Sequence, residues 1–530
     1  MVPLHIVEGL IIRRLLGRCA DALTDMEKHL SMLHMNRMPV LLPLACGEFS
    51  RPRRTARPLF PRPNRRLRAS LALLCCLATP AAPAAHAAAR NAQIEAIVAA
   101  ISPQRIEARI RKLASFHTRH TLSETASETR GIGAARRWIK AELEACGKAA
   151  GGSMQVAFDA FTQAPARRVP HPVEIVNVVA TLPGTQPGSA GRYYVVSGHY
   201  DSMPSNVMDP EGQAPGANDD ASGVAAVMEI ACAMAAHRFD ATLVFMAVAG
   251  EEQGLLGATH WAEQARAKRL DVAGMITNDI IGSPIAHDGT RNEHTVRLFA
   301  NGLPALLAAQ ASADAATAQA AREQVETIAR SGGEADTSTH QLGRYLKETA
   351  ERYLPGFSVN LIPRRDRFLR GGDHLPFLER GYPAVRFTEP AEDFRHQHQN
   401  VRTEDGVQYG DLPEFVEFSY VAQVARANAA GLASLALAPA APRDVGIEVV
   451  ALENDTTLRW AANTEPDLAG YRIVWRAPGD PVWRHARDVG KLTRYTLRGI
   501  SKDDYVFGVV ALDRDGNASP ASFAQPWRPR

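Results

Sequence analysis

Two adjacent glutamates, Glu251 and Glu252, stand shortly after an apolar run, residues 241–248, that has the composition of a buried β-strand. Like charges repel, and a carboxylate is costly to bury unless a cation or a proton compensates its charge. A glycine-rich turn follows the pair in the segment AGEEQGLLG. The pair therefore indicates a site where a positive group lies beside the end of a strand.

Further histidines and carboxylates occupy equivalent places along the chain. Each lies at the carboxyl end of a predicted strand or in the next loop, and open α/β sheets bind their ligands at that edge. Taken singly, each has an ordinary structural explanation; Asp220, for example, suits the cap of the following helix. The residues are His199, Asp201, Asp219, Asp220, Asp279, His396 and His398.

The combination of imidazole and carboxylate groups points to metal chemistry. Zinc accepts histidine nitrogen and carboxylate oxygen as ligands. Two zinc ions about 3.5–4 Å apart need a bridging carboxylate and compensating negative charge. The sequence therefore predicts a dinuclear zinc site, in which one glutamate of the pair binds metal and its neighbour handles a proton.

These motifs, taken in order, resemble the di-zinc exopeptidase family of bacterial leucyl aminopeptidase, aminopeptidase Y and glutamate carboxypeptidase. The resemblance covers roughly residues 95–435, and GANDDASG and AGEEQGLLGA are nearly complete matches to the family's motifs. It implies two Zn²⁺ ions per catalytic domain. His199 and Asp279 would bind one ion, and Glu252 and His398 the other. Asp219 would bridge both, with a cis peptide bond to Asp220.

The resemblance also implies the two catalytic roles. Glu251 would be the general base, taking a proton from the attacking water and passing it to the leaving amine. Asp201 would accept a hydrogen bond from the imidazole of His199 and so fix its tautomer.

The last metal ligand has two candidates in the sequence. We prefer His398, because the family places a threonine five residues after this ligand, and Thr403 stands there. His396 remains the alternative. Asp373 and His374, in a further family-like segment at 370–384, either line the pocket or form a helix cap and a packed histidine.

The elements that must position these residues alternate between strands and helices. Residues 90–437 are therefore expected to form an α/β catalytic domain, with a mixed, mostly parallel sheet between helices, of the zinc-exopeptidase type that the resemblance implies. Predicted strands are 173–182, 192–202, 241–248 and 272–282, with FSVNLIP and YPAVRF; predicted helices lie within 91–147, 221–237, 258–268 and 305–330.

The composition changes at a Pro/Ala linker near residues 435–444, and the pattern beyond it is all β. Short alternating strands separated by turns predict an immunoglobulin-like sandwich over 438–530. This segment resembles a fibronectin type III domain. It carries no catalytic residues, so we expect a spacer or adhesion module.

The N-terminal segment has the features of a processed leader. Residues 69–89 follow an arginine-rich stretch, contain a short apolar core and reach small residues that suit cleavage near 85–87. This pattern is typical of a signal peptide and is too short for a transmembrane helix. It predicts a periplasmic or secreted protein. Residues 1–68 would not normally precede a signal peptide and suggest an over-extended translation start.

Charge and cysteine content restrict the remaining functions. Residues 1–68 contain 13 Lys and Arg against 5 Asp and Glu, which leaves the rest of this +3 chain mildly acidic and gives no indication of a nucleic-acid partner. After residue 89 only Cys146 and Cys232 remain, which excludes a disulfide scaffold. The sequence allows either one disulfide or two free thiols.

The combined interpretation is a secreted zinc aminopeptidase acting on peptides with a free N-terminus. A carboxypeptidase or dipeptidase of the same family is the alternative. Four arginines near the pocket-like segment, Arg364, Arg365, Arg367 and Arg370, leave that option open, since arginine binds carboxylates. A catalytically inactive binding or adhesion module is a further alternative, but such relatives lose ligands, and all five are present here.

Overall fold

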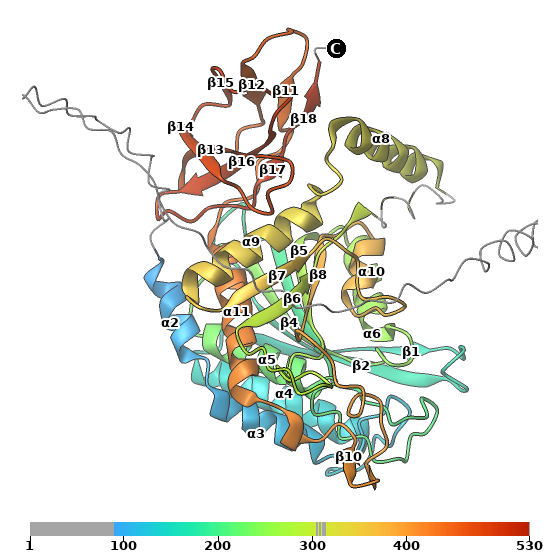
Figure 1. Ribbon diagram of the computed structural model, residues 1–530. Helices are drawn as coiled ribbons and strands as arrows, with labels where there is room; N and C mark the ends of the chain where they lie inside the picture. Colours follow the sequence, from blue (N-terminus) through green and yellow to red (C-terminus); the bar gives the residue numbers. More distant parts are fainter. Residues whose placement is uncertain (1–89, 304–305, 307–308, 310–313, 529–530) are drawn as a thin grey trace, which may run out of the picture. The chain divides into compact units, whose positions relative to one another are not determined.

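The computed structural model describes residues 90–528, except 304–305, 307–308 and 310–313. The predicted N-terminal extension and signal peptide lie outside these residues. In the described chain, residues up to 437 build one eight-stranded sheet with helices on both faces (Figure 1). This is the mixed α/β architecture that the sequence predicts.

The sheet has the strand order β1-β2-β4-β3-β5-β8-β6-β7. Its four inner neighbours β4, β3, β5 and β8 run parallel to one another, and β1, β2 and β6 add antiparallel pairings. Their carboxyl ends therefore meet at one edge. The strands are β1 Gln155–Gln163, β2 Val173–Leu182, β3 Arg192–His199, β4 Thr242–Val248, β5 Asp271–Asn278, β6 Thr295–Phe299, β7 Ser358–Ile362 and β8 Ala384–Thr388.

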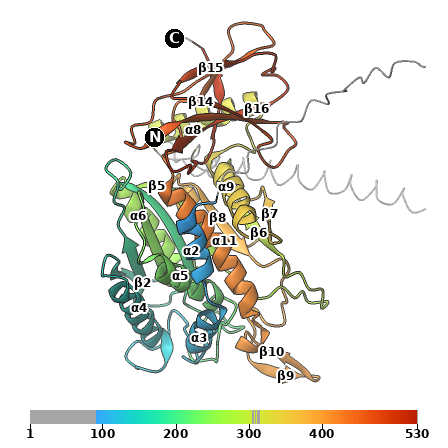
Figure 2. The same cartoon turned by 90° about the vertical axis from the view of Figure 1, so that its left-hand side faces the viewer.

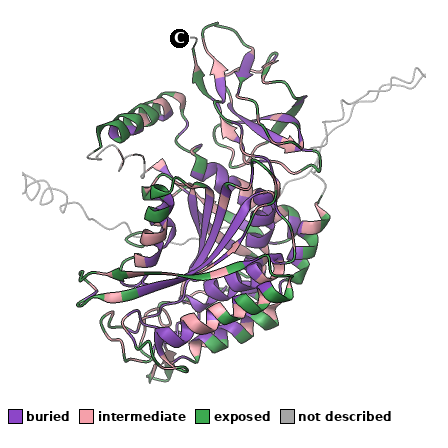
Figure 3. Cartoon of the chain, turned by 180° about the vertical axis from the view of Figure 1, so that it is seen from behind, coloured by how far each residue is buried: buried purple, intermediate pink, exposed green. Residues whose placement is uncertain are grey.

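The inner strands are apolar because both of their faces are covered. Every residue of β4 is buried, as are nearly all residues of β3 (Figure 3). Strands buried on both faces are typically near-continuous apolar runs. The sequence predicted β2, β4, β7 and β8 well, and it predicted β3 and β5 with carboxyl ends three and four residues too late. It missed β1, β6 and the short hairpin of β9 (Arg402–Glu404) and β10 (Val407–Tyr409).

Six helices form the larger layer on one face. The long helix α11 packs against α2, α9 and α5, as Figure 2 shows for α2 and α9. Helices α6 and α10 cover the other face, where they share a separate apolar core with β4 and β5. The larger layer contains α2 Ala92–Ala100, α3 Pro103–Ala114, α4 Gly131–Ala149, α5 Ala221–Met234, α9 Ser338–Tyr353 and α11 Phe418–Leu437; the smaller has α6 Leu256–Ala267 and α10 His374–Glu379.

Two further elements complete the described part of this domain, α8 (Ala315–Ser331) and the short 3₁₀ helix η1 (Pro413–Phe415). No helix in the described ranges is both long enough and apolar enough to span a bilayer.

Two glycines allow the start of α5 to approach β3 closely. A Cβ atom at Gly198 would lie 2.6 Å from the carbonyl carbon of Gly223, and one at Gly223 would lie 2.3 Å from the backbone oxygen of Asn278. Any side chain here would push the helix away from the sheet. The glycines thus let Asp219 and Asp220, just before α5, reach the end of β3.

A disulfide joins Cys146 of α4 to Cys232 of α5 across 86 residues of sequence. The sequence allowed either a disulfide or two free thiols, and the structure has the disulfide. The bond links two helices of the larger layer.

The C-terminal segment forms a β-sandwich. One sheet has the order β15-β12-β11-β18 and the other β14-β13-β16-β17, around a core that includes Trp460, Tyr471 and Phe507. The strands are β11 Gly446–Glu448, β12 Thr456–Arg459, β13 Leu468–Arg476, β14 His485–Gly490, β15 Arg494–Leu497, β16 Val506–Asp513, β17 Ser522–Phe523 and β18 Gln525–Trp527.

The sandwich is joined to the α/β domain by a buried ion cluster. Asp336, just before α9, pairs with Arg344 of α9 at 2.8 Å and with Arg476 of β13 at 2.6 Å. All three side chains are at most 6% exposed. The hydroxyl of Tyr345 also donates to the backbone oxygen of Ala518 at 2.9 Å. The sandwich therefore contributes to the stability of the helix it touches, which is more than a flexible spacer would do.

We expect Arg476→Ala to destabilise the protein by about 1.5–3 kcal/mol, because Asp336 loses its charged hydrogen bonds to Arg476 but keeps its pair with Arg344. Arg472→Ala is the matched control on the same strand. Arg472 pairs with the largely exposed Asp488, and loss of such a pair costs less than about 1 kcal/mol. Urea unfolding of both variants measures the difference. Equal midpoints would contradict a structural role for the buried cluster.

Candidate metal centre

The predicted ligands meet at the carboxyl edge of the four parallel strands. His199 is the last residue of β3, and Asp279 follows β5 directly. Glu252 follows β4 and His398 lies in the loop after β8. Asp219 comes from the loop before α5. The topology of the sheet thus brings together five residues that span 200 positions of the chain.

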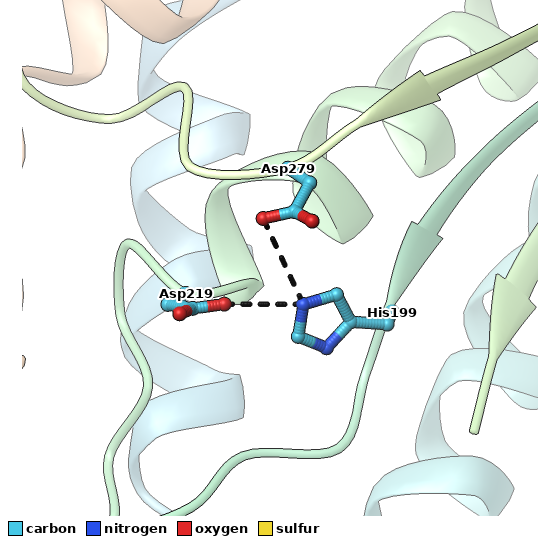
Figure 4. A group of neighbouring side chains, drawn as sticks. All are labelled: His199, Asp219 and Asp279. Atoms are coloured by element: carbon cyan, nitrogen blue, oxygen red, sulfur yellow. Dashed lines mark ion pairs between the residues drawn. The ribbon is translucent and has the colours of Figure 1, made fainter. Parts of the chain in front are cut away.

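Asp219 lies at the centre of this group. One carboxylate oxygen is 3.1 Å from Nε2 of His199, and the other is 2.9 Å from Nε2 of His398. Asp279 approaches the same nitrogen of His199 at 3.9 Å (Figure 4). A carboxylate whose two oxygens face two different imidazoles has the geometry of a bridging ligand.

The ligand atoms form three overlapping sets, and the atoms within each lie within 4.8 Å of one another. These sets are His199 with Asp219 and Asp279; Asp219 with Glu252 and His398; and His199 with Glu251 and Glu252. The first two share only Asp219. Nitrogen and carboxylate oxygen donors suit Zn²⁺, and the excess of carboxylates over imidazoles suits a cation. The residues present therefore fit a metal ion such as Zn²⁺.

Asp201 anchors the glutamate pair through the backbone. Its carboxylate accepts hydrogen bonds from the amide N–H of Glu251 at 3.3 Å and of Glu252 at 3.1 Å, and from Thr121 Oγ1 at 3.0 Å. The carboxylate of Asp201 is fully buried. It therefore fixes the turn that presents both glutamates to the site.

Asp201 also orients the ring of His199, but through its backbone oxygen and not through the carboxylate that the sequence analysis expected. Its Nδ1 lies 3.1 Å from the backbone oxygen of Asp201 and 3.6 Å from the carboxylate. The carbonyl is therefore the closer acceptor, while the carboxylate is used mainly by the glutamate turn. Either contact leaves Nε2 facing Asp219 and Asp279.

The geometry distinguishes the two histidines near residue 397. Nε2 of His398 is 3.1 Å from Glu252 and 2.9 Å from Asp219. The ring of His396 instead stacks on Phe415, with centroids 3.7 Å apart. Of the two candidates, only His398 faces the carboxylates.

The titration of these groups reflects the crowding of charge. Burial disfavours the charged form of His199, but the neighbouring carboxylates of Asp201 and Asp219 outweigh it and raise its pKa well above the ordinary value. Burial raises the pKa of Glu251 well above its usual range, and Glu252 and Asp279 add to this while His199 opposes it. A proton or a cation is therefore needed beside these carboxylates.

Asp220 supports the loop without facing the site. One carboxylate oxygen caps α5 by accepting from the Gly223 amide at 2.9 Å, and the other accepts from the His199 amide at 3.0 Å. The peptide bond between Asp219 and Asp220 is cis.

Asp411, in the loop after β10, was missed by sequence analysis. Its carboxylate accepts from the amides of Asn218 at 2.8 Å and Asp219 at 2.7 Å. Gln397 was missed as well, and its Nε2 donates to Asp219 at 3.0 Å. No local sequence feature indicates that Asp411 or Gln397 contacts Asp219, because each lies about 180 or more positions away from it along the chain.

Arg386 is a third missed residue, and here the sequence does contain an indication. It stands among apolar residues of β8, is fully buried and pairs with Asp279 at 2.9 Å. A charged residue in a buried strand must have a partner. Arg386 therefore compensates part of the negative charge on Asp279.

Four of the five ligands line an open cleft of about 360 Å³: Asp219, Glu252, Asp279 and His398. Four arginines line it too: Arg168, Arg367, Arg370 and Arg386. Two of them belong to the basic segment singled out in the sequence. Asp373 and His374 do not line the cleft: both are buried, burial raises the pKa of Asp373 to about 7, and the His374 ring contacts the backbone oxygen of Arg365 at 2.8 Å.

Comparison with known proteins agrees with this geometry. A model described as "Peptidase family M28" matches residues 177–418. A "probable zinc metalloprotease" of Leptosphaeria maculans is 46% identical over 434 residues, covering 82% of this chain and 97% of the relative. Another from Pyrenophora teres f. teres is 44% identical over 434 residues, covering 82% and 87%.

Among solved structures, the LapA aminopeptidase of Legionella pneumophila is 18% identical, with a TM-score of 0.45 over 65% of this chain and 75% of that one. The identity to the fungal relatives extends over most of their length, and the family match spans His199 to His398. The chain therefore belongs to peptidase family M28 and is a metallopeptidase.

Proposed function

We propose that this metallopeptidase is an aminopeptidase that binds two zinc ions and hydrolyses the N-terminal bond of peptides. The observation that carries the proposal is the placement of Asp219 between His199 and His398, with one oxygen toward each. That arrangement suits a pair of ions better than a single one.

His199 and Asp279 would hold one ion, Glu252 and His398 the other, and Asp219 would hold both. When bound, zinc supplies Lewis acidity that polarises the scissile carbonyl and favours ionisation of the attacking water. It also offsets the carboxylate charge that burial makes costly.

Glu251 is the proposed general base. It lines the cleft beside the ligands, and the turn that carries it is anchored by Asp201. Its carboxylate takes the proton of the attacking water and donates it to the leaving amine. A neighbouring cation lowers the pKa of a carboxylate and so keeps Glu251 ionised for the first step.

A carboxypeptidase or dipeptidase is the second candidate function, and the arginines of the cleft favour it. Arg386 and Arg367 are already paired with Asp279 and Glu392, respectively. Arg370 is exposed, and Arg168 donates to the backbone oxygen of Glu252 at 2.6 Å. Arg168 and Arg370 have N–H groups that could bind a peptide carboxylate.

We further propose that the protein is exported, through a signal peptide over residues 69–89, and that residues 438–530 are a fibronectin type III domain. The disulfide between Cys146 and Cys232 supports export, because such bonds persist in oxidising compartments.

The first test compares leucine p-nitroanilide with its N-acetylated form, on protein that starts near Ala88. We expect two zinc ions per chain, cleavage of the free-amine substrate alone, and a loss in kcat of about 100- to 10,000-fold in Glu251→Gln with zinc retained. Absence of zinc and of activity would contradict the proposal. Two zinc ions without cleavage of either anilide would favour the carboxypeptidase candidate.

The second test separates the two histidines. We expect His398→Ala to lose one zinc ion and at least about 100-fold in kcat/KM, because an incomplete ligand set holds the ion poorly. His396→Ala is the matched control and keeps both ions. Metal analysis and anilide hydrolysis measure both effects. Loss of zinc in the control instead would reverse the assignment.

The third test concerns export. We expect the protein recovered from the periplasm or medium to begin near Ala88 and to yield, without reduction, a peptide pair joined through Cys146 and Cys232. Mass spectrometry identifies both. A mature protein that still contains residues 1–68 would contradict the leader assignment.

A further inference from the structure

Large apolar side chains are exposed beside the metal cleft. Phe368 is 81% exposed, Leu369 105% and Phe394 61%. Phe368 and Leu369 lie in the loop after β7, and Phe394 lies in the loop after β8. Exposed aromatic residues that cluster on two separate loops typically mark a binding surface.

Phe368 and Phe394 line a groove of about 470 Å³, which we call the aromatic groove. Its other apolar lining comes from Phe299 at the end of β6 and Ile362 at the end of β7, which are register partners in the sheet. The groove therefore has a floor of regular structure and walls of loop residues.

The walls are held in place by ion pairs. Glu392, in the loop after β8, pairs with Arg297 of β6 at 3.0 Å and with Arg367 of the other loop at 2.8 Å. Glu392 is 7% exposed. Both loops are thus tied to the sheet and to each other, so the groove exists before any ligand binds.

The aromatic groove adjoins the metal cleft. Arg367 and Arg370 line both hollows. An enzyme that removes one N-terminal residue holds that residue at the metal ions, and the rest of the peptide must leave the cleft through an open side. Because the groove adjoins the cleft, a peptide that leaves the metal ions on this side would pass over it.

The rim of the groove is basic. The guanidinium of Arg364 lies 3.7 Å from the centroid of the Phe368 ring, and Arg370 is exposed. A basic rim attracts carboxylates and repels lysine and arginine side chains.

We propose that the aromatic groove binds an apolar side chain of the leaving peptide, beyond the scissile bond, and favours peptides with acidic rather than basic neighbours there. The inference rests on the proposed aminopeptidase function. The enzyme would therefore hydrolyse peptides with a phenylalanine or leucine beyond the scissile bond with a higher kcat/KM than alanine peptides of equal length.

The experiment uses the peptide Leu-Ala-Ala-Ala-Ala and four variants with a single phenylalanine at positions 2 to 5. For the wild-type protein, phenylalanine at one position should raise kcat/KM about tenfold, as expected for a buried aromatic contact. We call the kcat/KM of the phenylalanine peptide divided by that of the alanine peptide the phenylalanine ratio. In the double variant Phe368→Ala, Phe394→Ala, this ratio should fall close to one. Lysine beside the phenylalanine should lower the wild-type ratio, and glutamate should raise it.

The control removes exposed apolar side chains elsewhere. Val450 and Leu452, in the sandwich, are 67% and 101% exposed, and the variant Val450→Ala, Leu452→Ala should keep the wild-type ratio. A wild-type ratio near one, or an unchanged ratio in the Phe368, Phe394 variant, would overturn the proposal. A ratio lost equally in the control would also overturn it. Dimers that dissociate when both phenylalanines are removed would show that the groove binds a second copy of the chain instead.

Binding of the same peptides to Glu251→Gln makes the test independent of turnover. If the phenylalanine peptide binds more tightly than the alanine peptide, and if this difference is lost when Phe368 and Phe394 are also replaced, the aromatic groove binds the phenylalanine side chain. This conclusion holds even if the wild-type protein cleaves neither anilide. In that case the proposed aminopeptidase function fails while the groove stands. Equal affinity for alanine and phenylalanine peptides overturns the groove alone.

Discussion

The carboxylate of Asp219 is the point on which the metal centre depends. It faces His199 with one oxygen and His398 with the other, so the two halves of the ligand set meet there. Around it, Glu251, Glu252 and Asp279 add negative charge in a place where burial makes charge costly. Cations must offset this charge, and Arg386 supplies one that belongs to the protein itself.

The supporting structure consists largely of carboxylates that accept backbone N–H bonds. Asp201 holds the glutamate turn, Asp220 joins α5 to β3, and Asp411 holds the segment that carries Asp219. Backbone contacts fix the position of a loop and leave its side chains free to bind metal. This preorganisation lets ligands from five separate segments converge within a few ångströms.

The general form of the fold was predictable from the sequence, because buried parallel strands are apolar runs of recognisable length. β3 and β4 show this directly. β1 was missed because it lies at the sheet edge and contains no buried residue that would form an apolar run. β6 was missed as well. The attachment of the C-terminal sandwich was equally invisible, because Arg476 and Asp336 meet only when two domains fold against each other.

The sequence by itself determined the residue types of the metal centre, since the motifs around His199, Asp219 and Glu252 are local. Only the tertiary structure decided which way each side chain points and which distant residues come into contact. It turned His398 toward the carboxylates and His396 toward Phe415, and it joined Cys146 to Cys232. It also formed the aromatic groove from two distant loops. A linear sequence specifies which groups are present, but contacts between remote segments exist only after the chain has folded.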